Sequence, residues 1–194
     1  MKLILASASS YRQALLKRLE IPFTAVAPDI DESPREGEPP GELSLRLATE
    51  KARVIAQRFS DAVVIGSDQV ASLDGELLGK PGSFDRAFEQ LRRSSGRRLE
   101  FHTGLCQLAP GFEDNATSVP FTVHFRELTD AEIQRYLELE QPFDCAGSFK
   151  CEGLGISLFE RLEGDDPTAL EGLPLIALCQ MLGQIGMHPL RPAD

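Results

Sequence analysis

The chain has 194 residues, and 42% of them are hydrophobic, which is sufficient for the core of a globular protein. Its longest apolar runs are about five or six residues, far below the roughly 20 of a membrane-spanning helix, and its N-terminal apolar run is too short for a signal peptide, so we expect a cytoplasmic protein that contacts no membrane. The formal net charge of −10 disfavours a nucleic-acid polymer as a partner but leaves a single nucleotide open, because a few cations in one cleft can hold a triphosphate.

Strands and helices alternate along the chain. The expected strands cover about residues 2–6, 23–27, 62–66, 70–73, 76–78, 99–108, 117–125 and 153–162, and the expected helices begin at Ser9 or Ser10, Glu42, Ser83, Thr129 and Pro174. The dipeptide Asp74-Gly75 predicts a hairpin, and Thr129 with Glu132 forms a capping box. We therefore expect an α/β fold with a mixed, twisted sheet, flanking helices and a cleft between two lobes, in a single domain over residues 1–194.

The polar residues that follow one apolar run are the strongest sign of a functional site. Residues 62–65 are Ala-Val-Val-Ile, a pattern typical of a buried strand, which we expect Gly66 to end. Asp68 would then lie just beyond the strand, where ligands bind in open α/β sheets. A carboxylate in that position can be a metal ligand, a general base or a turn former.

A second candidate site lies between the first strand and the first helix. Ser7, Ser9 and Arg12 surround an expected helix N-terminus, whose unpaired N–H groups and positive dipole end favour an anion. Small hydroxyl residues with one arginine fit a phosphate cradle. Alternatively, one serine only caps the helix and Arg12 is an ordinary surface residue.

Four further charged residues could complete such a site, although each has a simpler explanation. Glu32 lies in an acidic, proline-rich loop, where a carboxylate can bind Mg²⁺ or simply be solvated. Lys51 lies within the longest expected helix, a position more typical of a solvated helix face. Lys80 lies in a Gly-Lys-Pro segment, which either directs the lysine towards a phosphate or is a plain turn. Glu152 lies in a loop of small residues, which could line a base pocket or could be explained by glycine-rich turns alone.

The order of these motifs resembles that of the Maf family of nucleoside triphosphate pyrophosphatases. The resemblance covers about residues 3–185 and rests on Ala6-Ser7-Ala8-Ser9-x-x-Arg12, Asp31-Glu32, Glu50-Lys51-Ala52, Gly66-Ser67-Asp68-Gln69-Val70, Leu78-Gly79-Lys80-Pro81, Ala146-Gly147-Ser148, Glu152-Gly153, Ile156 and residues 163–174. It implies a two-lobed α/β fold with a deep cleft, usually in a homodimer. It also implies hydrolysis of a nucleotide between its α- and β-phosphates with a divalent cation, Mg²⁺ or Mn²⁺.

The resemblance also implies a role for each matched residue. The implied roles are proton acceptor for Asp68, phosphate binding for Ser7, Ser9, Arg12, Lys51 and Lys80, and metal binding for Glu32 and Asp68. The two lysines would also stabilise charge during the reaction and so count with Asp68 as catalytic. Whether Asp68 acts mainly as a base or as a metal ligand stays open.

Three positions distinguish the branches of this family. Tyr11, Gln69 and Glu152 resemble the branch of 7-methyl-GTP pyrophosphatases, whereas the dTTP and UTP branch usually has Arg, Thr and Gln there. Ser10 departs from the proline common to both branches. Physical chemistry agrees with the first branch, because N7-methylated guanine is cationic and favours stacking on an aromatic ring such as Tyr11 or Phe149. Its N1–H and exocyclic amine also offer Glu152 two donors.

Two alternatives to a 7-methyl-GTP pyrophosphatase stay open. One is a dTTP/UTP pyrophosphatase of the same family, and the other is a nucleotide-binding regulator without significant catalysis, since family members have been linked to cell-division arrest. The combination of Asp68, Glu32, Lys51 and Lys80 favours an enzyme, because a protein that only binds nucleotide does not need an acid and a metal site together.

Overall fold

The computed structural model describes residues 1–190. Its strands are β1 (Lys2–Ala6), β2 (Phe23–Ala25), β3 (Ala62–Leu73), β4 (Glu76–Leu78), β5 (Arg98–Leu108), β6 (Asn115–Phe125) and β7 (Phe159–Glu163). Its helices are α1 (Ser10–Lys17), α2 (Pro40–Ala56), α3 (Phe84–Ser94), α4 (Asp130–Glu140), α5 (Pro167–Glu171) and α6 (Leu175–Gln184), with 3-10 turns η1 (Ala146–Ser148) and η2 (Leu154–Leu158). No helix within residues 1–190 is both long and apolar enough to cross a membrane.

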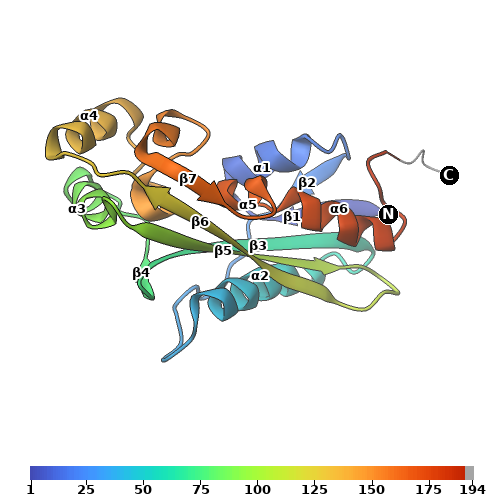
Figure 1. Cartoon of the computed structure of the whole chain (residues 1–194). Coiled ribbons are helices and arrows are strands. Elements are labelled where there is room, and N and C mark those ends of the chain that lie inside the picture. The colour runs from blue at the N-terminus through green and yellow to red at the C-terminus, as the bar shows by residue number, and fades with distance from the viewer. Residues whose placement is uncertain (191–194) are drawn as a thin grey trace.

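The strands form one mixed, seven-stranded sheet in the order β2-β1-β3-β5-β6-β7, with β4 paired to β3 (Figure 1). Strand β1 runs parallel to β2 and β3, whereas the pairs from β3 to β7 are antiparallel. This confirms the expected mixed α/β fold. The hairpin at Asp74-Gly75 is also confirmed, and both residues have the positive φ angles that such a two-residue turn needs.

Alternate residues of the parallel half of the sheet face two different helical layers. Leu3, Leu5, Val63 and Ile65 pack with α1 and α6 on one face. Ile4, Ala6, Ala62 and Val64 pack with α2 on the opposite face. Because both faces are covered, residues 3–6 and 62–65 are apolar in every position, which is why the sequence shows continuous rather than alternating hydrophobic runs there.

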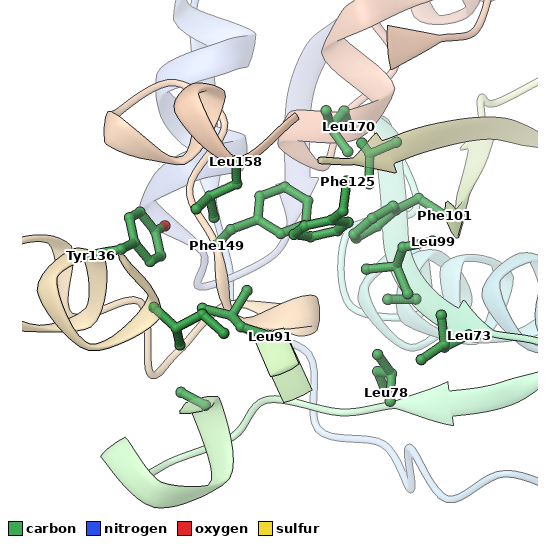
Figure 2. Packing of buried hydrophobic residues seen from close by; sticks show 14 of the residues in the cluster. Leu73, Leu78, Leu91, Leu99, Phe101, Phe125, Tyr136, Phe149, Leu158 and Leu170 are labelled. Carbon is green, nitrogen blue, oxygen red and sulfur yellow. The ribbon is translucent and has the colours of Figure 1, made fainter. Parts of the chain in front are cut away.

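The antiparallel half carries a second lobe with its own core. Strands β5 and β6 contribute Leu99, Phe101, Phe121, Val123 and Phe125, which pack with the apolar faces of α3 and α4. Phe149 lies among these residues and meets the rings of Phe101 and Phe125 edge-on (Figure 2). Figure 1 places α3 and α4 at the opposite end of the sheet from α1 and α6. The long strands β3 and β5 connect the two lobes.

The expectation that a strand ends at Gly66 is wrong. Strand β3 continues to Leu73, and Asp68 lies within it, paired with Gly104 of β5. Gly66 serves a different purpose: a Cβ there would lie 2.1 Å from the backbone oxygen of Ala48, so only glycine lets α2 cross the strand this closely. The parallel neighbour β1 does end opposite Gly66, so Asp68 still lies just beyond the C-terminal end of a parallel strand.

The expected strand at residues 153–162 is wrong in its first half. Residues Leu154–Leu158 form a 3-10 turn, and only Phe159–Glu163 pairs with β6. Gly155 is buried against the backbone of Lys150, where a Cβ would lie 2.3 Å from the carbonyl oxygen, so the chain turns tightly there. The other expected elements are present apart from differences at their ends, and so is the capping box of α4, whereas the short helix α5 and the turn η1 were not expected.

Candidate active site

A cavity of about 900 Å³ lies between the two lobes. All ten residues singled out from the sequence line it: Ser7, Ser9, Tyr11, Arg12, Glu32, Lys51, Asp68, Gln69, Lys80 and Glu152. They come from the turn between β1 and α1, from α1, the loop before α2, α2 itself, β3, the turn after β4 and the loop before η2. The structure therefore brings the sequence motifs into one cleft, while the role of each residue stays a prediction.

Lys51 is the centre of the charged end of this cavity. Its Nζ atom lies 2.5 Å from Oδ1 of Asp68 and 2.7 Å from Oε1 of Glu32. Lys51 is only 5% exposed although it lies on a helix, so the simpler explanation of a solvated helix face is wrong. Its position follows from α2, which Gly66 and Gly104 allow to lie directly on β3 and β5.

The two carboxylates beside Lys51 fit a hard divalent cation. Glu32 and Asp68 converge on the same ammonium group, and carboxylate oxygens are the ligands that Mg²⁺ prefers, together with waters and substrate phosphates. Burial raises the pKa of Glu32, but the hydrogen bond and charge of Lys51, with the charges of Lys80 and Arg12, outweigh it and leave the pKa below its usual value. Glu32 is therefore ionised at neutral pH. Residues 1–190 contain no cluster of three or more acidic, His or Cys side chains able to hold a metal, so waters and substrate phosphates would be needed to complete the coordination of a cation bound by Glu32 and Asp68.

The residues of the expected phosphate cradle lie around the turn between β1 and α1. Ser9 is the N-cap of α1 and accepts from the backbone N–H of Arg12, while Ser7 accepts from the N–H of Ser9 at 3.1 Å. Arg12 donates through Nε to the carbonyl of Gly172 at 2.8 Å, which fixes its side chain against the C-terminal end of α5. Burial lowers the pKa of Arg12, whereas the charges of Asp68 and Glu32 act against this effect. An arginine stays protonated in proteins, so the cradle carries a positive charge.

Gln69 is held by backbone groups of the α5 segment. Its Nε2 atom donates to the carbonyls of Ala169 at 2.8 Å and Leu170 at 3.0 Å. Thr103 donates to the same carbonyl of Ala169 at 2.8 Å. Gln69 therefore borders the cavity and also connects β3 to α5. Because these hydrogen bonds fix its side chain, Gln69 would influence substrate specificity without moving.

Asp166 does not line the cavity, but it supports the segment that holds Arg12, and the sequence motifs did not identify it. It is 3% exposed, and its carboxylate accepts from the N–H and hydroxyl of Thr168 and from the N–H of Ile176 at 2.8 Å. One side chain thus caps both α5 and α6, and α5 ends at the Gly172 carbonyl that holds Arg12. The sequence did carry a signal, because Asp-Pro-Thr is typical of an N-cap followed by proline at the first helical position.

A second group of lining residues, called here the acidic end of the cavity, is acidic and partly aromatic. Asp144, Glu152 and Glu171 line it together with Tyr11. Burial and the charge of Glu152 raise the pKa of Glu171, against the opposing charge of Arg18. Burial raises the pKa of Tyr11 as well, and its hydroxyl lies 3.8 Å from Sγ of Cys145. Phe149 lines the cavity as well, although it is only 5% exposed, so both aromatic residues named in the sequence analysis border this space.

A protein-family model covers almost the whole chain. The family model described as "Maf-like protein" matches residues 2–185. The chain belongs to the Maf family. A curated relative named 7-methyl-GTP pyrophosphatase, from Bordetella pertussis (strain Tohama I), is 54% identical over 189 residues, which is 97% of this chain and 94% of that protein.

A protein of the same name from Bordetella parapertussis is 53% identical to this Maf chain over the same length. Among solved structures, the Ham1 protein of Staphylococcus aureus aligns with a TM-score of 0.44 and 15% identity, covering 64% of this Maf chain and 72% of that chain.

Proposed function

We propose that this chain hydrolyses 7-methyl-GTP between its α- and β-phosphates, releasing 7-methyl-GMP and pyrophosphate. The observation that carries the proposal is the buried Lys51, placed between Asp68 and Glu32 in a cleft lined by both cationic and acidic side chains. The names of the Bordetella relatives, at 54% and 53% identity over nearly the whole chain, support the same reaction and substrate.

Asp68 is the proposed general base. Lys51 contacts its Oδ1 atom, so Oδ2 is the oxygen available to take a proton from the attacking water. Lys51, Arg12 and Lys80 supply positive charge on the phosphate side of the cavity, where charge builds on the phosphoryl oxygens and the leaving pyrophosphate. Because Arg12 and Lys51 are held by neighbouring groups, they stabilise that charge without a large rearrangement.

Glu32 and Asp68 are the residues proposed to hold a divalent cation, Mg²⁺ or Mn²⁺. Such a cation neutralises phosphate charge and polarises the phosphorus. The family resemblance further suggests a homodimer that acts in the cytoplasm, which gel filtration with light scattering and cell fractionation would test.

The acidic end of the cavity suits a cationic base. N7-methylated guanine carries a delocalised positive charge, which Tyr11 can stack against and which nearby carboxylates attract. Glu152 can accept from N1–H and the exocyclic amine as a charge-assisted pair, a pair of donors that uracil and thymine lack. A site of this kind rejects a base without those donors because its carboxylate is left unpaired.

The test is pyrophosphate release from 7-methyl-GTP, GTP, UTP and dTTP in the presence of Mg²⁺ or Mn²⁺. We expect fast release from 7-methyl-GTP and a loss of about 10²–10⁴-fold in turnover for Asp68→Asn. Asp114→Asn is the matched control, because Asp114 is an exposed carboxylate paired with Arg53 and does not line the cavity.

Other outcomes would revise defined parts of the proposal. Preference for UTP and dTTP would retain the reaction but refute the roles of Tyr11 and Glu152. A normal rate for Asp68→Asn would exclude that residue as the base. No release from any of the four nucleotides would instead favour the non-catalytic nucleotide-binding regulator.

A further inference from the structure

The loop that carries Glu32 contains no helix or strand between β2 and α2. Pro28, Glu32 and Pro34 nevertheless line the cavity, and Glu32 reaches Lys51 although its own side chain is 62% exposed. A loop with so little regular structure needs other contacts to hold one carboxylate at a fixed place.

Arg46 of α2 provides those contacts. Its Nε and Nη2 atoms bind the two carboxylate oxygens of Glu38 at 2.6 and 2.8 Å, and Nη2 also donates to the carbonyl of Ser33 at 3.0 Å. Its Nη1 atom donates to Glu50 at 3.2 Å. The side chains of Arg46 and Glu38 are only 13% and 9% exposed, in contrast to the surface ion pairs of this chain. The hydrogen bonds of Arg46 lower the pKa of Glu38 to about 2, so the pair stays charged over the working pH range.

These contacts connect the loop to the same helix that presents Lys51. Ser33 follows Glu32 directly in the chain, and Lys51 lies five residues after Arg46 on α2. The backbone of α2 is fixed on the sheet by its close approach to Gly66 and Gly104. One rigid helix therefore sets the position of Lys51 directly and the position of Glu32 through Arg46.

We propose that Arg46 is a positioning residue, which holds the Glu32 carboxylate at Lys51 by clamping residues 33–38 to α2. Arg46 itself does not line the cavity. The consequence for catalysis rests on the function proposed above, whereas the clamp itself rests only on the contacts of Arg46. The planar fork of arginine matches the two oxygens of Glu38, so lysine is expected to replace it only in part.

A double-mutant cycle tests the positioning role. Partners that orient a metal-binding carboxylate typically contribute about 10–100-fold to activity, and we expect Arg46→Gln to lower kcat by about that factor with a smaller change in nucleotide KM. If Arg46 acts through Glu32, then Arg46→Gln should have little further effect in a Glu32→Gln background. Arg46→Lys should recover part of the activity. Arg53→Gln is the matched control, since Arg53 lies on the same helix but forms an exposed pair with Asp114.

Limited proteolysis examines the clamp without any nucleotide. Trypsin should cleave after the exposed Arg35 faster in Arg46→Gln than in wild type or Arg53→Gln, as followed by mass spectrometry. Equal cleavage rates, or losses in kcat that multiply fully in the double variant, would overturn the proposal. If wild type releases no pyrophosphate, the proposed function fails, and the cleavage rates alone decide whether Arg46 clamps the loop.

Discussion

Replacing Lys51 by methionine should destabilise the protein and make its stability depend on divalent cations. The substitution keeps the length of a side chain that is 5% exposed, but it removes the ammonium group that contacts both Asp68 and Glu32. Removing one partner of a buried ion pair costs about 3–5 kcal/mol, because a charge stays behind in a poorly hydrated place.

Two features of the site reduce that figure here. The Glu32 side chain is 62% exposed, so its carboxylate can regain water, and Asp68 borders a cavity into which water can enter. We therefore expect Lys51→Met to lower the free energy of unfolding by about 2–4 kcal/mol. The formal charge of the three side chains also changes from minus one to minus two. Mg²⁺ should consequently raise the melting temperature of the variant more than that of wild type.

Urea denaturation and thermal melting with and without Mg²⁺ would measure both effects. Lys80→Met is the control, because Lys80 borders the same cavity but is exposed, and we expect its stability to change by no more than about 0.5 kcal/mol. The double variant Lys51→Met/Asp68→Asn should recover part of the loss, since it removes the buried charge as well. If Lys51→Met were as stable as wild type and responded no more strongly to Mg²⁺, the assignment of Lys51 as the central cation would be refuted.

Two further predictions concern the frame around the site. Asp166→Ala removes the cap of two helices and should lower the free energy of unfolding by about 2–4 kcal/mol. The control is Asp165→Ala, because the neighbouring Asp165 is exposed and should tolerate alanine. Equal melting temperatures for the two variants would contradict the capping role. The second prediction concerns stability in acid. The pKa of Glu38 is about 2 in the folded state, compared with its ordinary value of 4.5. Between these two pH values the folded state binds fewer protons than the unfolded state, so the free energy of unfolding decreases as the pH falls through this interval. Urea titrations from pH 6 to pH 3 should show a smaller decline for Glu38→Gln than for wild type, and identical slopes would argue against the pair with Arg46.

The sequence was most informative where a local rule fixes the outcome. The capping box at Thr129 and the turn at Asp74-Gly75 depend on a few adjacent residues, and both form as expected. The candidate site residues were found because the motifs were read in order, and the structure places all ten on one cavity. Their side chains converge because β1, α2 and β3 meet where the parallel part of the sheet ends.

The predictions that were wrong or missing concern residues whose roles depend on packing between segments that are far apart in the sequence. Gly66 looks like a strand breaker in isolation, but the crossing of α2 over β3 decides its role, and no local pattern contains that crossing. Arg46 was overlooked because one basic residue on a helix gives no sign of its partner, and here the partner lies eight residues earlier in a loop of irregular backbone. Likewise, Lys51 has the sequence surroundings of an exposed helical residue, and only the packing of α2 on the sheet buries it.

The distribution of charge in the cavity gives a physical reason for a substrate with separated charges. Arg12, Lys51 and Lys80 gather on one side in a protein whose net charge is −10, and they compensate the phosphates. On the other side, burial raises the pKa of Glu171, the charge of Arg18 opposes this, and the nearby charge of Glu152 adds to the rise, so an ionised Glu171 is disfavoured there. A neutral base does not offset this effect, whereas a cationic base does so directly. On the proposed function, the same acidic end that disfavours GTP, UTP and dTTP therefore favours a nucleotide that is anionic at its phosphates and cationic at its base.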